Sequence, residues 1–189
     1  SGMEQVPDPS ALFLSGLGAP GCAVHCAMEG TRPMLVEVQS LINPTTFGNP
    51  RRMSTGVDSN RLALLLAVLE KKLGARLSDK DVYLNVVGGL RLDERASDLA
   101  VSMCVLSCLA DKPLGAHTAA IGEIGLTGEI RAVSQLEQRV RECARLGYRR
   151  VLIPKAGKLP PLEGVELVRA GSIAEAARLL QAPPNSASL

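Results

Sequence analysis

The sequence predicts an α+β fold in which a mixed β-sheet carries helices layered on one side. Strand-like runs come in pairs at the start and helical runs lie between later strands, roughly in the order β-β-β-α-β-α-β-β-α-β-β-α. This order favours a mixed sheet over a doubly wound parallel one. The 189 residues fit one domain, and a hydrophobic content of 46% supplies a sizeable core. That core must be aliphatic, because Trp is absent and Phe and Tyr number two each.

The predicted strands are short runs of apolar and β-branched residues bounded by glycine, proline or polar turn residues. Residues 31–33 form the first turn, residues 45–49 form a loop, and residues 126–128 form the turn of a later hairpin. Strands are expected over residues 21–30, 33–42, 82–87, 118–124, 129–133, 151–153 and 165–168.

The first two helices are predicted from apolar spacing and from their end residues. Asp58 or Ser59 caps the first, which ends before Gly74. Ser97 or Asp98 starts the second, which is apolar on most faces and should be buried. The first helix presents one apolar stripe, formed by Leu62, Leu65, Leu66, Leu69 and Leu73.

Two further helices are predicted from serine and glutamate three residues apart. Ser134 with Glu137 forms a capping box for a helix that ends at Gly147, and Ser172 with Glu175 caps a last short helix. The sequence thus provides four helices to cover the sheet.

The two ends of the chain differ in composition from its middle. Residues 1–20 are rich in Pro, Gly and Ser and are interpreted as a tag remnant followed by an interdomain linker; residues 182–189 are expected to be a disordered tail. Residues 21–181 then form the domain of a piece excised from a longer protein. Residues 16–21 match G-x-G-x-x-G, but a dinucleotide site requires a strand before the motif and a helix after it, and here a strand follows. No G-x-x-x-x-G-K-[ST] motif occurs, so this piece carries no P-loop.

Charge and cysteine usage exclude several classes of function. The net charge of +2 gives no global field for a polyanion, so a nucleic-acid role would need a local basic patch. The few aromatic residues argue against a stacking platform. The five cysteines form no C-x-x-C, and His25 and His117 lack ligand-like spacing to a cysteine pair. We interpret the cysteines as free thiols in a reducing cytoplasm and expect no metal site. The longest apolar run, residues 99–109, is too short to span a bilayer.

Four stretches carry a specific combined signal: "MEGTRPMLVEVQSLINPT", "NPRRMSTGVDSNRLALLLAVLEKK", "NVVGGLRLDERASDLAVSMCVLSC" and "GEIGLTGEIRAVSQLEQRVRECARLGYRRVLIPK". Together they resemble the C-terminal Lon-protease-like domain of the RadA (Sms) family of bacterial DNA-repair proteins, over about residues 10–181. The resemblance implies the fold of the Lon proteolytic domain, which is of the ribosomal-protein-S5-domain-2 type.

The resemblance also implies a setting for the domain. The family's whole protein is an ATP-driven, helicase-like motor that promotes branch migration in homologous recombination, and its Lon-like domain is associated with ring assembly and DNA binding. We therefore expect a homohexameric ring, single-stranded or branched DNA and the recombination machinery as partners, and a cytoplasmic, nucleoid-associated location without a membrane. This piece should need no cofactor, whereas ATP, Mg and Zn belong to the missing ATPase and zinc-finger parts.

The positions that match the Lon catalytic dyad predict a domain without peptidase activity. Ser97 falls where the Lon serine lies, but the position of the dyad lysine holds Glu137, and no lysine occurs between Pro113 and Pro154. A serine hydroxyl needs a base to become a nucleophile at neutral pH. We expect Ser97 to act as a helix N-cap, with a Lon-type serine peptidase as the less favoured alternative.

Arginines at the edges of predicted elements are the candidate DNA contacts, because arginine binds phosphate through two parallel hydrogen bonds and stays charged. The expected set is Arg51, Arg52, Arg61, Arg91, Arg131 and Lys155, with Lys158 a weaker candidate. A ring would multiply such contacts. A purely structural oligomerisation scaffold is the alternative, and it would show no salt-dependent DNA binding.

Overall fold

The computed structural model describes residues 18–179. Most of the expected linker and all of the expected tail lie outside the described residues. Within them, the elements follow the order β-β-β-α-β-α-β-β-β-α-β-β-α, which has one strand more than predicted. The structure is therefore of mixed α and β type, as the sequence predicted. No helix among residues 18–179 has the length and apolarity needed to cross a bilayer.

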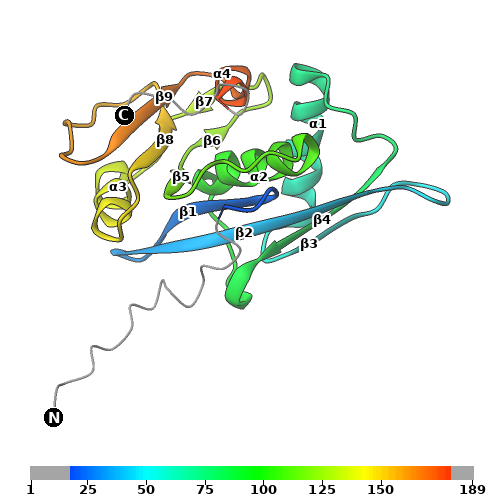
Figure 1. Ribbon diagram of the computed structural model, residues 1–189, viewed down its shortest axis with the longest axis horizontal. Coiled ribbons are helices and arrows are strands. Elements are labelled where there is room, and N and C mark those ends of the chain that lie inside the picture. Colours follow the sequence, from blue (N-terminus) through cyan, green and yellow to red (C-terminus); the bar gives the residue numbers. More distant parts are fainter. Residues whose placement is uncertain (1–17, 180–189) are drawn as a thin grey trace, which may run out of the picture.

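A four-stranded mixed sheet forms one layer of the molecule (Figure 1). Its strands are β1 (Cys22–Glu29), β2 (Arg32–Pro44), β4 (Lys80–Val86) and β3 (Arg52–Thr55), in that spatial order. The first three pair antiparallel, whereas β3 lies parallel to β4. The predicted order has a third strand before the first helix, but no residue range was assigned to it, and β3 follows the expected loop over residues 45–49. Its backbone ladder with β4, rather than an apolar pattern of its own, makes this segment a strand.

The remaining strands form a second sheet and a two-stranded ribbon, so the expectation of one mixed sheet is wrong. β5 (Thr118–Ala120), β8 (Arg150–Pro154) and β9 (Glu166–Ala170) make a parallel sheet in the order β5-β8-β9. β6 (Glu123–Ile124) and β7 (Ile130–Arg131) pair antiparallel with each other.

The predicted strand over residues 118–124 divides at Gly122. The Gly122 amide donates to the Ala96 carbonyl at 2.9 Å, and its carbonyl accepts from the Leu99 amide at 3.0 Å. The backbone therefore leaves one sheet to bond with the start of the second helix before it enters the ribbon. A Cβ at position 122 would lie 2.9 Å from the Ile130 side chain, so only glycine fits without a shift.

The two longer helices match their prediction closely. α1 (Ser59–Leu73) is capped by Asp58, whose carboxylate accepts from the Arg61 amide at 3.0 Å, and it ends at Gly74 in the left-handed conformation. Its leucine stripe is buried apart from Leu73, which is half-buried. α2 (Asp98–Ala110) is buried from Asp98 through Ser107. Figure 1 shows α2 lying between the four-stranded sheet and α4 (Ile173–Arg178), whereas α1 stands on the same side of the sheet at its right-hand end and reaches the level of α4.

The third helix, α3 (Leu136–Arg145), does not begin with the predicted capping box. Gln135 takes the N-cap position with φ of 58°, and it makes no side-chain cap bond. The Ser134 carbonyl instead accepts from Nε of Arg139 at 3.0 Å. The sequence could not show this contact, because it depends on the burial of Arg139. In α4 the expected cap is present, since the Ser172 hydroxyl accepts from the Glu175 amide at 3.2 Å.

Two apolar clusters form the core, and β2 supplies both. Val36 and Val38 belong to the first cluster, with α1, α2 and α4. Leu35 belongs to the second, which contains Val140 of α3 and Val151 of β8. Because successive strand residues point to opposite faces, one strand can serve the two clusters. The chain is thus held together across β2 as well as within each layer.

Candidate nucleic-acid interface

The two residues at the protease-dyad positions contact different partners. Ser97 ends a short 3₁₀ turn over Arg95–Ser97, is buried, and donates its hydroxyl to the Glu94 carbonyl at 2.8 Å. Ser97 holds the N-cap position of α2, as predicted, but its side chain makes no cap bond to the helix. The Glu137 carboxylate accepts from Nη2 of Arg141 at 2.7 Å, one helical turn away on α3. The hydroxyl of Ser97 is therefore bonded to a backbone carbonyl, which cannot serve as a general base.

A buried ionic cluster lies directly beside Ser97, and we call Glu94, His25 and Arg139 the Glu94 cluster. Arg139 is 2% exposed and binds the Glu94 carboxylate through both oxygens, at 2.6 and 2.9 Å. Nε2 of His25, which is fully buried, lies 2.7 Å from Oε1 of the same carboxylate. Nδ1 of His25 lies 3.1 Å from the Ala120 carbonyl, so both ring nitrogens face acceptors. Arg139 also donates to the Cys26 carbonyl at 2.8 Å.

The electrostatics of this cluster favour an ionised Glu94. Burial alone would raise the pKa of Glu94, but hydrogen bonds and charge interactions with His25 and Arg139 outweigh burial and lower the pKa from 4.5 to about 2. Every polar atom of the cluster described above has a partner inside the protein. The Glu94 cluster is therefore structural: its carboxylate joins β1 to α3, and Nδ1 of His25 links β1 to β5.

Arg61, one of the predicted DNA contacts, is partly buried and its guanidinium bonds groups of the protein itself. Its Nε donates to Oδ1 of Asp98 at 2.9 Å, its Nη2 bonds Oδ2 of Asp98, and Nη2 also donates to the Ile124 carbonyl at 3.1 Å. Asp98 is 2% exposed. Burial raises the pKa of Asp98, against the opposing hydrogen bonds from Arg61 and the Ile124 amide. Arg61, a predicted DNA contact, is therefore already bound to Asp98 and to the Ile124 carbonyl within the chain.

Arg52 is also engaged internally. Its Nη2 donates to the Leu77 carbonyl at 2.7 Å, and its Nη1 bonds the Lys80 carbonyl. These two carbonyls belong to the segment that enters β4, so Arg52 joins β3 to the neighbouring loop. A guanidinium that already satisfies two backbone acceptors has fewer donors left for a phosphate.

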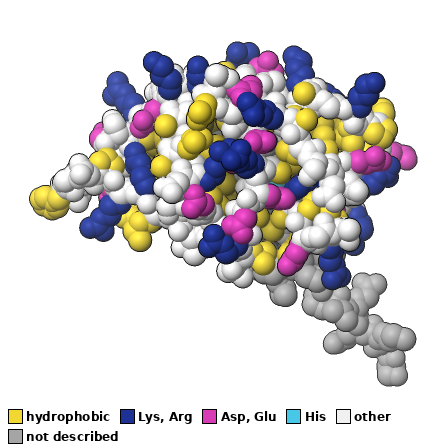
Figure 2. Space-filling view, turned by 180° about the vertical axis from the view of Figure 1, so that it is seen from behind, with side chains coloured by type: hydrophobic (Ala, Val, Ile, Leu, Met, Phe, Trp, Pro, Cys, Tyr) yellow, Lys and Arg dark blue, Asp and Glu magenta, His cyan; other side chains and the backbone are white. Residues whose placement is uncertain are grey.

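The other predicted contacts lie on the surface. Arg51 and Lys155 are exposed. Arg91 pairs with Asp93 at 3.2 Å and Arg131 with Glu129 at 3.1 Å, and both arginine side chains are more than half exposed. Figure 2 shows Lys and Arg side chains spread over one face of the molecule with acidic side chains among them, rather than in one continuous stripe. These four residues could each meet a phosphate, because exposed ion pairs are weak and exchangeable.

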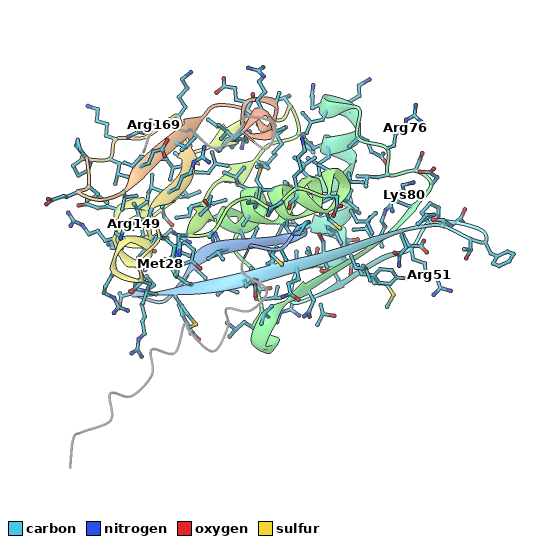
Figure 3. All side chains as sticks on the ribbon, viewed as in Figure 1. Met28, Arg51, Arg76, Lys80, Arg149 and Arg169 are labelled. Carbon is cyan, nitrogen blue, oxygen red and sulfur yellow. The ribbon has the colours of Figure 1, made fainter. Side chains whose placement is uncertain are left out.

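A basic groove, which the sequence did not predict, lies between the C-terminal ends of α1 and α2 and the helix α4. It has a volume of about 760 Å³. Figure 3 places two of its residues, Arg76 and Lys80, at the same end of the molecule as Arg51, whereas Arg149 and Arg169 lie toward the other end. The cationic residues that line it are Lys72, Arg76, Lys80, Lys112 and Arg178. They come from separate segments, so no local motif in the sequence predicts the groove.

The described residues contain no cluster of three or more His, Cys, Asp or Glu side chains arranged to hold a metal. The five cysteines are free thiols: Cys26, Cys104 and Cys143 are buried, and Cys22 and Cys108 are half-buried. Burial is the main cause that raises the pKa of the Cys104 thiol far above its usual range. A thiol of this kind is a poor nucleophile and a poor metal ligand.

The family model described as subunit ChlI of Mg-chelatase matches residues 59–157, which is more than half of the chain. The chain therefore belongs to this family. The matched region runs from the start of α1 past the end of β8, so it includes α2, α3 and the ribbon. It contains the position of Ser97 but no P-loop motif.

Curated relatives are similar to nearly the whole chain. The DNA repair protein RadA of Bacillus subtilis (strain 168) is 50% identical over 182 residues, which cover 94% of this chain and 40% of that protein. The protein of the same name from Halalkalibacterium halodurans is 54% identical over 156 residues, covering 82% of this chain and 34% of that protein. The one from Listeria monocytogenes is 49% identical over 181 residues, or 93% and 39%. The chain thus spans about two fifths of the length of these relatives or less.

Proposed function

We propose that this chain is a non-proteolytic, Lon-like domain of a bacterial DNA-repair protein, which supports DNA binding and the assembly of a homohexameric ring. The observation that carries the proposal is the identity of about one half, over most of the chain, with proteins named DNA repair protein RadA. The Lon-like fold of the ribosomal-protein-S5-domain-2 type belongs to the same proposal, as does a cytoplasmic, nucleoid-associated location.

The activity of the longer protein forms the second part of the proposal. A DNA-dependent ATPase with helicase-like action in homologous recombination would supply ATP and Mg sites, together with a zinc finger, in segments outside this chain. The absence of a P-loop motif here supports that division, since a P-loop NTPase holds its phosphates with this motif. Contacts with single-stranded or branched DNA and with recombination proteins would then be shared between this domain and the motor.

DNA contact in this domain is assigned to the exposed residues Arg51, Arg91, Arg131 and Lys155. Arg52 and Arg61 are left out, because their guanidinium groups satisfy acceptors inside the fold. A few exposed phosphate contacts bind weakly in one copy. In a ring, the same contacts recur in every subunit and raise the apparent affinity.

Replacing Arg51, Arg91, Arg131 and Lys155 together by alanine should weaken DNA binding with little dependence on base sequence. For every phosphate that is no longer bound, the slope of log affinity against log salt should fall by about one. Fluorescence anisotropy with labelled duplex and single-stranded oligonucleotides, at several salt concentrations, measures both quantities. Arg141→Ala is the matched control, because Arg141 is an exposed arginine outside the proposed set.

Two outcomes would redirect this assignment. If the quadruple variant binds DNA like the parent, with an unchanged sedimentation coefficient, these four residues do not contact DNA. If the parent chain itself shows no salt-dependent binding, the domain is an oligomerisation scaffold and DNA is handled by the missing motor.

A fluorophosphonate probe should leave Ser97 unlabelled, and the chain should cleave no peptide substrate. The reason is that the Ser97 hydroxyl is buried and donates to the Glu94 carbonyl, whereas Glu137, at the dyad-lysine position, accepts from Arg141 instead. Mass spectrometry of the probed protein reads the result, with a known serine peptidase as the positive control. Stoichiometric labelling of Ser97 would establish the peptidase alternative instead. Ser97→Ala should cost only about 0.5–1.5 kcal/mol of stability, the usual contribution of one hydrogen bond.

A further inference from the structure

The basic groove combines a cationic rim with an apolar floor. The rim is formed by the five Lys and Arg residues named above, and among residues 18–179 none that lines the groove is acidic. Lys80 pairs with the exposed Asp79 at 3.6 Å, which is a weak surface contact. Lys72, Arg76, Lys112 and Arg178 are exposed. In a chain whose net charge is only +2, five cations around one concavity form a marked local excess.

The floor consists of aliphatic side chains from three helices and the segment after α1. Leu73 and Leu109 are half-buried at its centre, and Leu106 is 8% exposed. Four alanines, Ala75, Ala110, Ala174 and Ala177, complete it and leave room for side chains from a partner. The volume of about 760 Å³ lies within the range of about 300–1,000 Å³ that is usual for concave binding sites.

We propose that this groove binds an acidic amphipathic helix of a partner protein. An amphipathic helix lays its apolar face into a groove of this kind and keeps its polar face at the rim. Leucine-type side chains of the partner would cover Leu73 and Leu109, and its carboxylates would meet Arg76, Lys112 and the other rim cations. The floor and the rim then have different roles: apolar contact with the floor supplies affinity, and the charges of the rim select an acidic partner.

A nucleic-acid backbone fits the groove less well, although it would satisfy the rim. Phosphates would leave Leu73, Leu109 and the alanines facing polar groups, so the apolar floor would contribute nothing. The inference goes beyond the proposed function, since none of the four proposed DNA contacts lines the groove.

The test is an NMR titration of the ¹⁵N-labelled 189-residue chain with a synthetic peptide of about 18 residues. The peptide carries leucines at helical i, i+3, i+4, i+7 spacing and glutamates elsewhere. A peptide of identical composition but scrambled order removes the apolar stripe while keeping the charge. We expect shifts confined to the ends of α1 and α2 and to α4, at least tenfold weaker binding of the scrambled peptide, and a similar loss in Arg76→Glu/Lys112→Glu. Arg149→Glu, at an exposed cation outside the groove and outside the proposed DNA contacts, should bind the peptide like the parent.

Equal binding of the two peptides, shifts outside the groove, or no shift at millimolar peptide would each overturn the proposal. A titration with a duplex oligonucleotide tests the alternative that the groove binds nucleic acid. If it shifts the same groove resonances and displaces the peptide, and if Arg76→Glu/Lys112→Glu abolishes this effect, the groove is a nucleic-acid site and not a peptide site. Should the double charge reversal fail to fold by circular dichroism, Arg76→Gln/Lys112→Gln takes its place with the same expectations. Loss of DNA binding in the quadruple alanine variant is read separately, so the two proposals can fail independently.

Discussion

Glu94→Gln should destabilise the folded chain by about 3 kcal/mol at neutral pH. The carboxylate accepts from Arg139 through both oxygens and lies 2.7 Å from Nε2 of His25. A glutamine amide can accept through one atom only, and its NH₂ group would face a donor. Removing one partner of a buried ion pair typically costs about 3–5 kcal/mol, and the Glu94 side chain is 24% exposed, which places the effect at the low end. Urea unfolding followed by circular dichroism measures the difference.

The pH dependence of the difference in unfolding free energy between the parent chain and Glu94→Gln provides a second check. The pKa of Glu94 is lowered from 4.5 to about 2 in the folded chain, so the folded state stabilises the ionised carboxylate more than the unfolded state does. The stability that it contributes is complete above about pH 4.5 and is lost as the pH falls toward about 2. The difference in unfolding free energy between the parent chain and Glu94→Gln should therefore become smaller as the pH falls from about 4.5 to about 2. A gap of less than about 0.5 kcal/mol at neutral pH, as expected for Glu137→Gln in its exposed pair, would show that the Glu94 cluster is not structural.

Arg61→Ala should destabilise the folded chain by about 3–5 kcal/mol. The variant leaves the carboxylate of Asp98, which is 2% exposed, with the Ile124 amide at 3.0 Å but without its cation. An uncompensated buried charge carries this order of penalty. Thermal or urea unfolding tests the value. Arg91→Ala is the matched control, because the Arg91–Asp93 pair is exposed on both sides and should contribute less than about 1 kcal/mol.

A double-mutant cycle separates the ion pair from the loss of packing. Arg61→Ala/Asp98→Ala should be less destabilising than the sum of the single changes, because no charge is left buried alone. Additive effects would show that Arg61 and Asp98 do not interact. An unfolding free energy unchanged in Arg61→Ala, together with weaker DNA binding, would support the interpretation of Arg61 as a phosphate contact.

Features encoded within one helix could be predicted from the sequence. The stripe in α1 follows from leucine spacing, and the caps at Asp58 and Gly74 follow from residue types with defined backbone preferences. The uniform burial of α2 follows from its lack of a polar face. In each case the residues that determine the feature are close together in the chain, so a short stretch of sequence contains the whole pattern.

Features that depend on distant partners could not be predicted. β3 is a strand because β4 lies beside it, and Arg61 is internal because Asp98 is buried 37 residues away. The Ser134–Glu137 pattern suggested a capping box, but Arg139 donates a hydrogen bond to the Ser134 carbonyl and Gln135 occupies the cap position. The basic groove is assembled from separate segments. The positions of arginines at predicted element edges therefore identified exposed Arg51, Arg91 and Arg131 but could not distinguish them from Arg52 and Arg61.

The Glu94 cluster also determines the order in which the protein can be completed during synthesis. Cys26 and Arg139 are 113 residues apart in the chain, and His25 and Ala120 are 95 residues apart. At about 5–20 residues per second, a ribosome needs roughly 6–23 s to make the segment between Cys26 and Arg139. For most of that interval, from the completion of β2 at Pro44 onward, β1 and β2 lack the helix and the arginine that cover their second face. The time for which this apolar surface stays open in the cell is therefore set by the rate of translation, not by the rate at which the finished chain folds.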